Sequence, residues 1–336
     1  MNKGPLLLLI LVSIPTIMAD RNRINPFSKT NNDTGFGTNA SSYGGRFINR
    51  DGTYNLRKEG ASFWDRFSVF HTMLNMPAWK FIVVIVLFFL CINVLYTIIY
   101  LLIGLSGFTG IVGTSEWEKI EEIYFFSTET FTTVGYGRVN PVGTGVNMVA
   151  AIEAMSGFLS FAVATGLIYG RFAKPKSYIA FSEQALIAPF RDKTALMFRI
   201  VSYKDNHNLT NAEIKVNAAL QINEDGNTTY KFYELDLERS KVDTLMMNWT
   251  VVHPIDERSP LLGLSEEDFK NSDLEVYVMV RGYDDVYSNT VIRRTSYVYD
   301  EIVFNAKFVT MYHESEDGKT TIVELDKLSA YEKMRH

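Results

Sequence analysis

The sequence is poor in cysteine and has no excess of basic residues. Cys91 is the single cysteine among 336 residues, so no disulfide can form within the chain and a disulfide-stapled fold is excluded. The 33 Lys and Arg residues are outnumbered by 38 Asp and Glu residues, which gives a formal net charge of −5. Proteins that bind nucleic acid gain affinity by neutralising phosphates with basic side chains. We therefore expect no nucleic-acid partner.

Signatures of catalysis and of metal binding are also missing. The sequence has no Ser or Cys nucleophile motif and, after residue 175, neither a βαβ alternation nor a Gly-rich fingerprint. The histidines lack the spacing of metal ligands; they are His71, His207, His253, His313 and His336. We expect neither an enzyme nor a resident cofactor.

Charge is absent from one long stretch and almost absent from a second. Residues 81–105 are 25 residues without a charge, and a helix rising ~1.5 Å per residue would at this length cross the ~30 Å hydrocarbon core of a bilayer. Residues 146–170 are rich in Gly, Ala and Ser and are interrupted only by Glu153. Because small residues allow close helix packing, we expect an outer transmembrane helix at 81–105 and an inner one at 146–170.

A third apolar run, residues 5–19, resembles the core of a secretory signal and would by itself place the amino terminus outside. The distribution of basic residues disagrees. Nine Lys and Arg residues lie within residues 20–80 and more follow residue 170, whereas the loop between the two long runs holds only Lys119 and Arg138. The positive-inside bias then places both termini in the cytoplasm of a cell-membrane protein with two spans. Residues 1–45 form an amino-terminal extension. Within it, 5–19 is a cleaved signal, an extra segment or the product of a start site assigned too far upstream.

The segments that flank the two spans have different patterns. Residues 62–76 place Phe and Met side chains at helical spacing, which predicts an amphipathic helix along the cytoplasmic membrane surface, with a packed cytoplasmic helix as the alternative. After Pro175 the chain alternates apolar and polar residues in six runs separated by turn residues, which predicts an all-β sandwich for 171–336.

A short segment between the two spans carries the potassium-filter signature. Residues 120–132 have a helical period but are too short to cross a membrane, and Thr-Val-Gly-Tyr-Gly follows directly. In potassium channels the main-chain carbonyls of this string replace the water shell of the ion. One chain supplies a quarter of each carbonyl ring, so we expect a homotetramer. The expected filter residues are Thr133, Val134, Gly135, Tyr136 and Gly137, with K⁺ bound by the carbonyls of the first four.

Three charged residues near this string need partners or a polar environment. We expect Glu129 to form a salt bridge with Arg138 that braces the filter from behind; the alternative is two solvated charges at the external mouth. Glu153, inside the second span, should lie near or behind the base of the filter, and its contact with permeating ions stays open.

These motifs resemble the inward-rectifier potassium channel family, especially its prokaryotic branch. The resemblance is carried by ETFTTVGYG at 129–137, TGLIYGRFAKPK at 165–176, VVHPIDERSPLLG at 251–263 and RTSYVYDEI at 294–302. RFINRDGTYNLRKEG, at 46–60, also looks like the family's amino-terminal cytoplasmic strand. The resemblance implies two transmembrane helices with a re-entrant pore helix and filter, a slide helix within 46–80, and an immunoglobulin-like cytoplasmic β-sandwich.

The resemblance also implies where the channel closes and which lipids it contacts. The family's inner gate maps to Leu167 and Tyr169, with Gly157 or Gly166 as a hinge unless these glycines serve close helix packing. Anionic lipids would bind basic residues just inside the membrane, although a topology signal explains the same residues; they are Arg66, Lys80, Arg171, Lys174 and Lys176.

One position departs from the family pattern. Strong rectifiers hold an acidic residue midway along the inner helix, which binds Mg²⁺ or polyamines, and the matching residue here is Phe161. We therefore expect weak rectification, with residual block at an acidic cytoplasmic ring that maps to Asp284 and Asp285. Ba²⁺ should block the filter.

Three other interpretations remain open at this stage. They are a channel of another two-span class with a cytoplasmic ligand-binding domain, an enzyme anchored to the membrane, and a non-conducting structural subunit. The strand-rich tail argues against the first, the missing catalytic motifs against the second and the intact filter string against the third.

Overall fold

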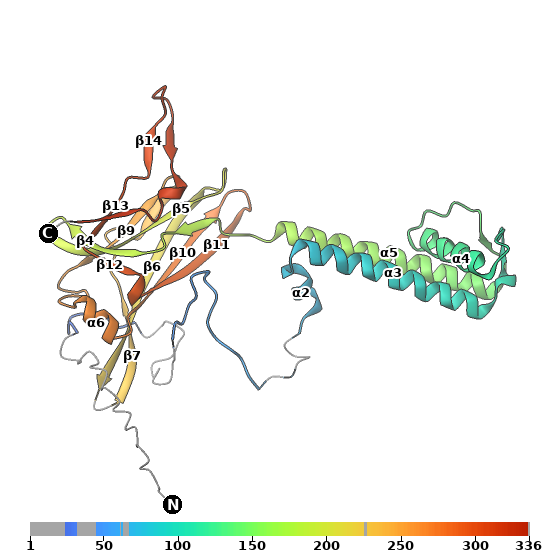
Figure 1. Cartoon of the computed structure of the whole chain (residues 1–336), viewed down its shortest axis with the longest axis horizontal. Helices are drawn as coiled ribbons and strands as arrows, with labels where there is room; N and C mark the ends of the chain where they lie inside the picture. The colour runs from blue at the N-terminus through green and yellow to red at the C-terminus, as the bar shows by residue number, and fades with distance from the viewer. Residues whose placement is uncertain (1–23, 32–44, 61, 63–66, 225–226, 335–336) are drawn as a thin grey trace, which may run out of the picture. The chain divides into compact units, whose positions relative to one another are not determined.

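The chain folds into two compact units. The computed structural model describes residues 24–31, 45–60, 62, 67–224 and 227–334 (Figure 1). One unit comprises residues 58–174, and the other comprises residues 1–57 together with 175–336. The apolar run 5–19 and Arg66 lie outside the described residues.

The described residues of the helical unit contain four α-helices of very different length. They are α2 (Val69–Asn75), α3 (Ala78–Ile103), α4 (Glu116–Phe131) and α5 (Thr144–Ala173). A proline separates α2 from α3, because Pro77 lacks a backbone N–H and holds the preceding Met76 extended at ψ of 155°. At its other end α3 stops at Gly104, whose φ of 109° is open to glycine but not to residues with a side chain.

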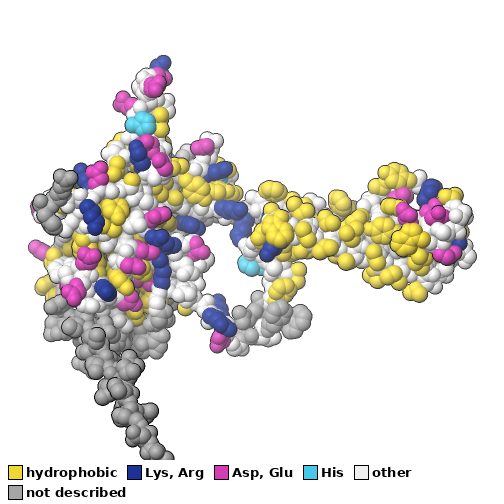
Figure 2. All heavy atoms as spheres, viewed as in Figure 1, with side chains coloured by type: hydrophobic (Ala, Val, Ile, Leu, Met, Phe, Trp, Pro, Cys, Tyr) yellow, Lys and Arg dark blue, Asp and Glu magenta, His cyan; other side chains and the backbone are white. Residues whose placement is uncertain are grey.

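Two of the described helices, α3 and α5, are long and apolar enough to cross a membrane. Helix α3 begins three residues before the apolar run expected at 81–105 and ends two residues before its end, whereas α5 extends beyond 146–170 by two residues at its start and three at its end. Hydrophobic side chains cover much of the surface of this unit (Figure 2), and Cys91 is among the exposed residues of α3. Such a surface is stable when lipid or another protein covers it.

Helix α4 is too short to span a bilayer and begins at a well-formed cap. Ser115 Oγ accepts a hydrogen bond from the Glu118 N–H, and the Glu118 carboxylate accepts one from the Ser115 N–H at 3.0 Å. This capping box satisfies N–H groups that the first helical turn leaves unpaired. Helix α4 starts at Glu116, four residues earlier than the sequence period indicates.

The second unit is built on two five-stranded sheets. The first has the order β11-β10-β6-β7 with β8 also paired to β6, and the second has the order β12-β4-β5-β3 with β9 paired to β5. The strands are β3 (Ile179–Phe181), β4 (Ala185–Phe190), β5 (Lys193–Ser202), β6 (Leu209–Glu224), β7 (Asn227–Glu234), β8 (Lys241–Leu245), β9 (Trp249–Ile255), β10 (Glu275–Asp284), β11 (Asn289–Val298) and β12 (Ile302–Phe304).

Alternate residues of the strands form a shared core. On β10, Val276, Val278 and Val280 are no more than 1% exposed, as expected when every second side chain faces inward. They belong to one hydrophobic cluster with residues of β5 and β9 from the other sheet, so the two sheets pack face to face.

Smaller elements complete this unit. They are helix α6 (Glu266–Asn271) and the two-stranded pairs β13 (Ala306–Phe308) with β16 (Tyr331–Lys333) and β14 (Tyr312–Glu314) with β15 (Thr321–Val323). Strand β12 runs parallel to β4, whereas the other strand pairs of the two large sheets are antiparallel. The all-β expectation for 171–336 therefore omitted one short helix.

Segments that precede the helices pack on this β unit. Phe47 and Ile48 are buried, and their N–H groups donate to the carboxylate of Glu275 at 2.9 and 3.2 Å. Further upstream, Thr30 pairs with Tyr233 on β7, the edge strand of the first sheet. Part of the 1–45 extension thus covers an edge strand that would otherwise be open to pairing with other chains.

The buried His253 predicts a pH-dependent stability. Its Nδ1 lies 2.6 Å from the Asp236 carbonyl oxygen and its Nε2 lies 2.8 Å from Ser259 Oγ, and burial lowers the pKa of the imidazole. The folded state therefore favours neutral His253, while the unfolded chain binds a proton near pH ~6.5. The stabilisation is complete above that pH and is lost as the pH falls below it. We expect the melting temperature, followed by far-UV circular dichroism in detergent, to drop several degrees less between about pH 7.5 and about pH 5.5 in His253→Gln than in the wild type.

Substitution of the exposed His71 provides the control. The melting temperature of His71→Gln should fall with pH as much as that of the wild type. Equal melting shifts in the wild type and in His253→Gln would show that His253 does not carry this effect.

Candidate functional site

The segment that follows α4 has an unusual backbone. Thr133, Gly135 and Gly137 have φ values of 60°, 55° and 80°, whereas Val134 and Tyr136 between them are not in the left-handed region. Glycine adopts positive φ at no steric cost, but a β-branched threonine does so only when its surroundings hold it there. The alternation in φ lets successive main-chain carbonyls point to the same side of the segment.

The last turns of α4 hold this backbone in place. The carbonyl oxygen of Glu129 accepts hydrogen bonds from the N–H groups of Val134 at 2.8 Å and Gly135 at 3.3 Å. At the other end, the side chain of Asn140 donates to the Gly137 carbonyl at 2.6 Å. Glu129 therefore supports residues 133–137 through its main chain.

Arg138 pairs with a different carboxylate from the one expected. Its Nη1 lies 3.2 Å from Glu122 Oε1. Within the chain, Arg138 therefore forms its salt bridge with Glu122 and not, as expected, with Glu129. The reason lies in the strand pair β1 (Phe108–Thr109) with β2 (Asn140–Pro141). Gly110, next to this pair, touches the main chain of Arg138, and the Val112 N–H donates to Glu122 Oε2 at 3.0 Å. These contacts bring Arg138 to Glu122, near the middle of α4, rather than to Glu129 near its end.

Glu153 lies in a fully buried polar cluster that joins three helices. Its carboxylate accepts hydrogen bonds from Ser127 Oγ on α4 and from the Tyr100 hydroxyl on α3. Ser127 Oγ also lies 3.2 Å from the side-chain oxygen of Asn93 on α3. Glu153, Ser127 and Asn93 are each 0% exposed. Glu153 is thus located behind α4, one of the two positions expected for it.

The two candidate hinge glycines have different surroundings. A Cβ on Gly157 would lie 1.9 Å from the carbonyl oxygen of Phe131, the last residue of α4, so this glycine permits a close approach of α5 to α4. A Cβ on Gly166 would meet nothing within 4 Å. Of the two, Gly157 fits the alternative of close packing, and Gly166 is the one free to bend.

The residues expected along the inner pathway differ in exposure. Tyr169 and Phe161 are 73% and 69% exposed, whereas Leu167 is 9% exposed and packs within its own chain. Because its side chain is buried within its own chain, Leu167 does not fit the gate position expected for it. Phe161 and Thr133 line the same cavity of 390 Å³.

The basic residues expected to bind lipid have several partners. Arg171 donates to main-chain carbonyls at the end of α2, and Lys174 donates to the Asn75 side chain. Lys80 lies 5.4 Å from the centre of the Trp79 ring. The side chains of Lys80 and Lys176 are both exposed. Arg171 is therefore occupied by protein rather than free for a headgroup.

Of the two residues expected in an acidic cytoplasmic ring, Asp284 and Asp285, only one is exposed. Asp284 is 2% exposed, accepts hydrogen bonds from the Val286 and Tyr287 N–H groups and lies 2.9 Å from His207 Nδ1. These contacts close the turn between β10 and β11, so Asp284 cannot belong to an open acidic ring. Asp285 is exposed.

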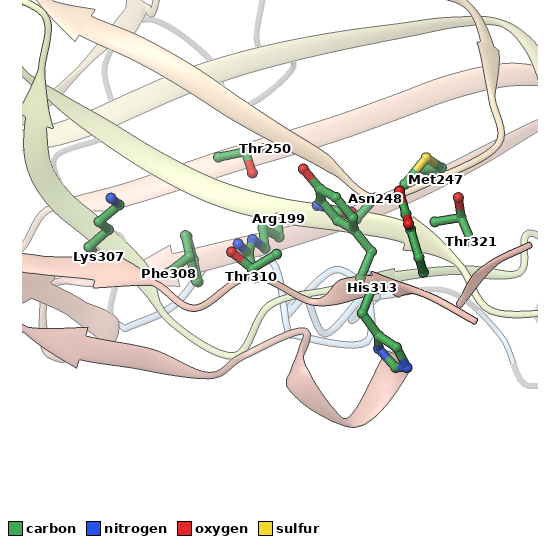
Figure 3. Close-up of a pocket in the computed structure, with 11 residues that line it drawn as sticks. Arg199, Met247, Asn248, Thr250, Lys307, Phe308, Thr310, His313 and Thr321 are labelled. Atoms are coloured by element: carbon green, nitrogen blue, oxygen red, sulfur yellow. The ribbon is translucent and has the colours of Figure 1, made fainter. Parts of the chain in front are cut away.

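A cavity of 830 Å³ in the β unit was not foreseen from the sequence (Figure 3). Arg199 on its wall is 6% exposed, and its guanidinium lies over the Phe308 ring at 4.6 Å. The Nε and Nη1 atoms of Arg199 have no hydrogen-bond partner among the described residues, and burial lowers the pKa of this side chain. The signal in the sequence was an arginine inside the apolar run ALMFRIVSY.

Known proteins resemble the chain along most of its length. The inward rectifier potassium channel C-terminal domain family matches residues 179–336. Inward rectifier potassium channel Kirbac3.1 from Paramagnetospirillum magnetotacticum is 30% identical over 280 residues, which cover 82% of this chain and 92% of that protein. ATP-sensitive inward rectifier potassium channel 8 from Homo sapiens is 25% identical over 299 residues, 81% of this chain and 70% of that protein.

Among solved structures, the sporulation control protein Spo0M from Bacillus subtilis is 9% identical and covers 36% of this chain and 46% of its own, with a TM-score of 0.22. This likeness is too low to bear on the fold.

Gly157 and Gly166, two of the glycines of α5, provide a matched test of the packing against α4. Gly157→Ala should destabilise the protein by about 1–3 kcal/mol, because its Cβ meets a main-chain oxygen that cannot move without shifting residues 131–133. Gly166→Ala should be neutral or stabilising by about 0.5–1 kcal/mol, because alanine is the better helix former and finds open space. Thermal unfolding of the purified protein in detergent measures both. Equal effects of the two substitutions would contradict the close approach at Gly157.

Proposed function

We propose that this chain, which belongs to the inward rectifier potassium channel family, assembles as a homotetramer that conducts K⁺ passively across the cell membrane. The observation that carries the proposal is the positive φ at Thr133, Gly135 and Gly137, directly after a helix too short to span and between two helices that are long enough. Four such segments around one axis make stacked rings of carbonyl oxygens.

Selectivity follows from the replacement of water by these oxygens. A K⁺ ion that enters the rings loses its hydration shell and is coordinated by the carbonyls of Thr133, Val134, Gly135 and Tyr136, so it is the transported ion and not a cofactor. The irregular backbone is tolerated at membrane depth because it lines a water-filled path and is not exposed to lipid.

The polar cluster around Glu153 supports the filter from behind. A hydrogen-bonded carboxylate that joins α3, α4 and α5 fixes the position of α4 relative to both long helices. Because α4 in turn holds Val134 and Gly135 through the Glu129 carbonyl, the cluster sets where the filter lies. Glu153 is buried within the chain, so it acts on ions only through this support.

Closure is assigned to the cytoplasmic end of α5. Tyr169 is exposed on the single chain, and four tyrosine rings at one level would close the path by contact and by excluding water. Gly166, with open space around its Cα, provides the place for α5 to bend. The buried Leu167 side chain contributes to the packing of α5 within the subunit.

Both termini are assigned to the cytoplasm. With two spans, the chain before α3 and the chain after α5 lie on the same side of the membrane. The packing of residues 24–31 and 45–55 on the β unit that follows α5 supports this arrangement. Lys80 and Lys176 would then face anionic headgroups, each at about 1 kcal/mol.

Potassium flux is the direct test of this function. Liposomes that contain the purified protein should take up rubidium, exclude sodium and lose the flux when Ba²⁺ is added. Gly135→Ala should abolish the flux, because alanine is strained at a φ of 55° and cannot keep the carbonyls aligned. Gly263→Ala is the matched control, since Gly263 also has a positive φ of 77° but lies in the β unit. Sodium uptake equal to that of rubidium would overturn the proposal.

Rectification is proposed to be weak, because the cavity that holds Phe161 has no acidic side chain to bind a polycation. Phe161→Asp should strengthen block by cytoplasmic spermine by about tenfold or more, since four introduced carboxylates attract the cation along the pore axis. Currents in planar bilayers measure the block, and Phe161→Asn is the uncharged control. Strong spermine block of the wild type, lost only on changing Phe161, would contradict the assignment. Residual block at Asp285 should be unaffected.

A further inference from the structure

Helix α2 has main-chain carbonyls that it cannot satisfy by itself. It is seven residues long, has no basic residue in its last turn and has no buried residue. The last four carbonyls of a helix lack a partner within the helix, and helices this short are marginal in water. A cationic donor at the C-terminal end can therefore stabilise α2, because it donates hydrogen bonds to these carbonyls and matches the negative end of the helix dipole.

Arg171, near the end of α5, supplies this cation. Its Nη1 donates to the Met73 carbonyl at 2.6 Å and lies 3.4 Å from the Leu74 carbonyl, and its Nη2 donates to the Met76 carbonyl at 2.8 Å. The guanidinium also lies 4.7 Å from the centre of the Phe81 ring at the start of α3. Only a planar fork with several donors can satisfy these carbonyls at once and lie against a ring.

Two neighbouring contacts hold α2 at the same place. Lys174 donates to the side chain of Asn75, one helical turn after Arg171. A Cβ on Gly170 would lie 3.1 Å from Leu74 Cδ2, so the missing side chain lets α2 approach α5 closely. The last turn of α5 therefore holds the end of α2 through one ionic cap, one side-chain hydrogen bond and one close packing contact.

We propose that Arg171 is a positioning residue that fixes α2 to the cytoplasmic end of α5, and that it does not act as a lipid ligand. The inference deepens the proposed channel function, on which its consequence for gating rests. Because Tyr169 lies two residues before Arg171, a displacement of α2 along the membrane surface moves the proposed gate with it. Lipid recognition falls to Lys80 and Lys176, and a lysine at position 171 could not replace the arginine.

Hydrogen exchange tests the cap without any assumption about conduction. The Thr72 and Met76 N–H groups are hydrogen-bonded within α2, so their exchange reports how firmly the helix is held. In Arg171→Lys and Arg171→Gln, peptides that cover residues 67–80 should exchange about tenfold faster than in the wild type, measured by mass spectrometry on the purified protein in detergent. Lys176→Gln removes a charge from the same cluster without touching α2 and should leave this exchange unchanged. Unchanged exchange in Arg171→Lys would overturn the proposal.

Rubidium flux tests the consequence for gating. We compare the flux in phosphatidylcholine liposomes with the flux in liposomes that also contain phosphatidylglycerol. In Arg171→Lys and Arg171→Gln the flux should depend little on phosphatidylglycerol, so that the fluxes with and without this lipid differ by less than about twofold. This expectation holds whichever lipid favours opening in the wild type. In Lys176→Gln the wild-type ratio of the two fluxes should return at a higher phosphatidylglycerol content. A wild-type ratio in Arg171→Lys together with a loss in Arg171→Gln would mean that Arg171 acts only as a charge for lipid, which would refute the proposal.

The two arms separate the failure of this proposal from the failure of the proposed function. If the wild type carries no flux but α2 loses protection in Arg171→Lys, the channel assignment fails and the cap stands. If flux is normal and selective but protection does not change, the cap fails and the channel assignment stands.

Discussion

The structure of the helical unit depends on how a few main-chain groups are satisfied where no regular helix continues. After α4 the N–H groups of Val134 and Gly135 turn back to the Glu129 carbonyl, which leaves the carbonyls of residues 133–136 available for something else. In hydrocarbon an unpaired backbone group costs several kcal/mol, so this segment is stable only beside water, ions or other copies of itself. The proposed pore meets this constraint, because water and ions reach the carbonyls there.

The same constraint explains the polar groups on the inward faces of α3, α4 and α5. Asn93, Ser127 and Glu153 are expensive to bury singly, and they are buried as a connected set in which each has a partner. The glycine at position 157 brings α5 against the last carbonyl of α4. Together these contacts hold a short helix at a defined depth between two long ones, which residue hydrophobicity alone could not do.

At the other end of the helices, cationic side chains act on protein rather than on lipid alone. A count of basic residues near the membrane treats Arg171, Lys174 and Lys176 alike, yet in the structure they differ. Arg171 caps α2, Lys174 holds its Asn75, and Lys176 has no role in α2. Three basic residues of similar charge thus differ in their contacts, and the shape of the guanidinium decides what Arg171 does.

The sequence by itself determined the two long apolar helices, the short helix with its glycine-containing string and the strand-rich tail, because length, charge and periodicity are local properties that burial enforces directly. Only the tertiary structure decided which charges meet. Arg138 reaches Glu122 because the β1–β2 pair carries it back to the middle of α4, Asp284 is enclosed by its own turn, and Leu167 packs within its own chain. Sequence spacing gives the distance along the chain, but the partner of a side chain depends on how distant segments fold back, which no local pattern contains.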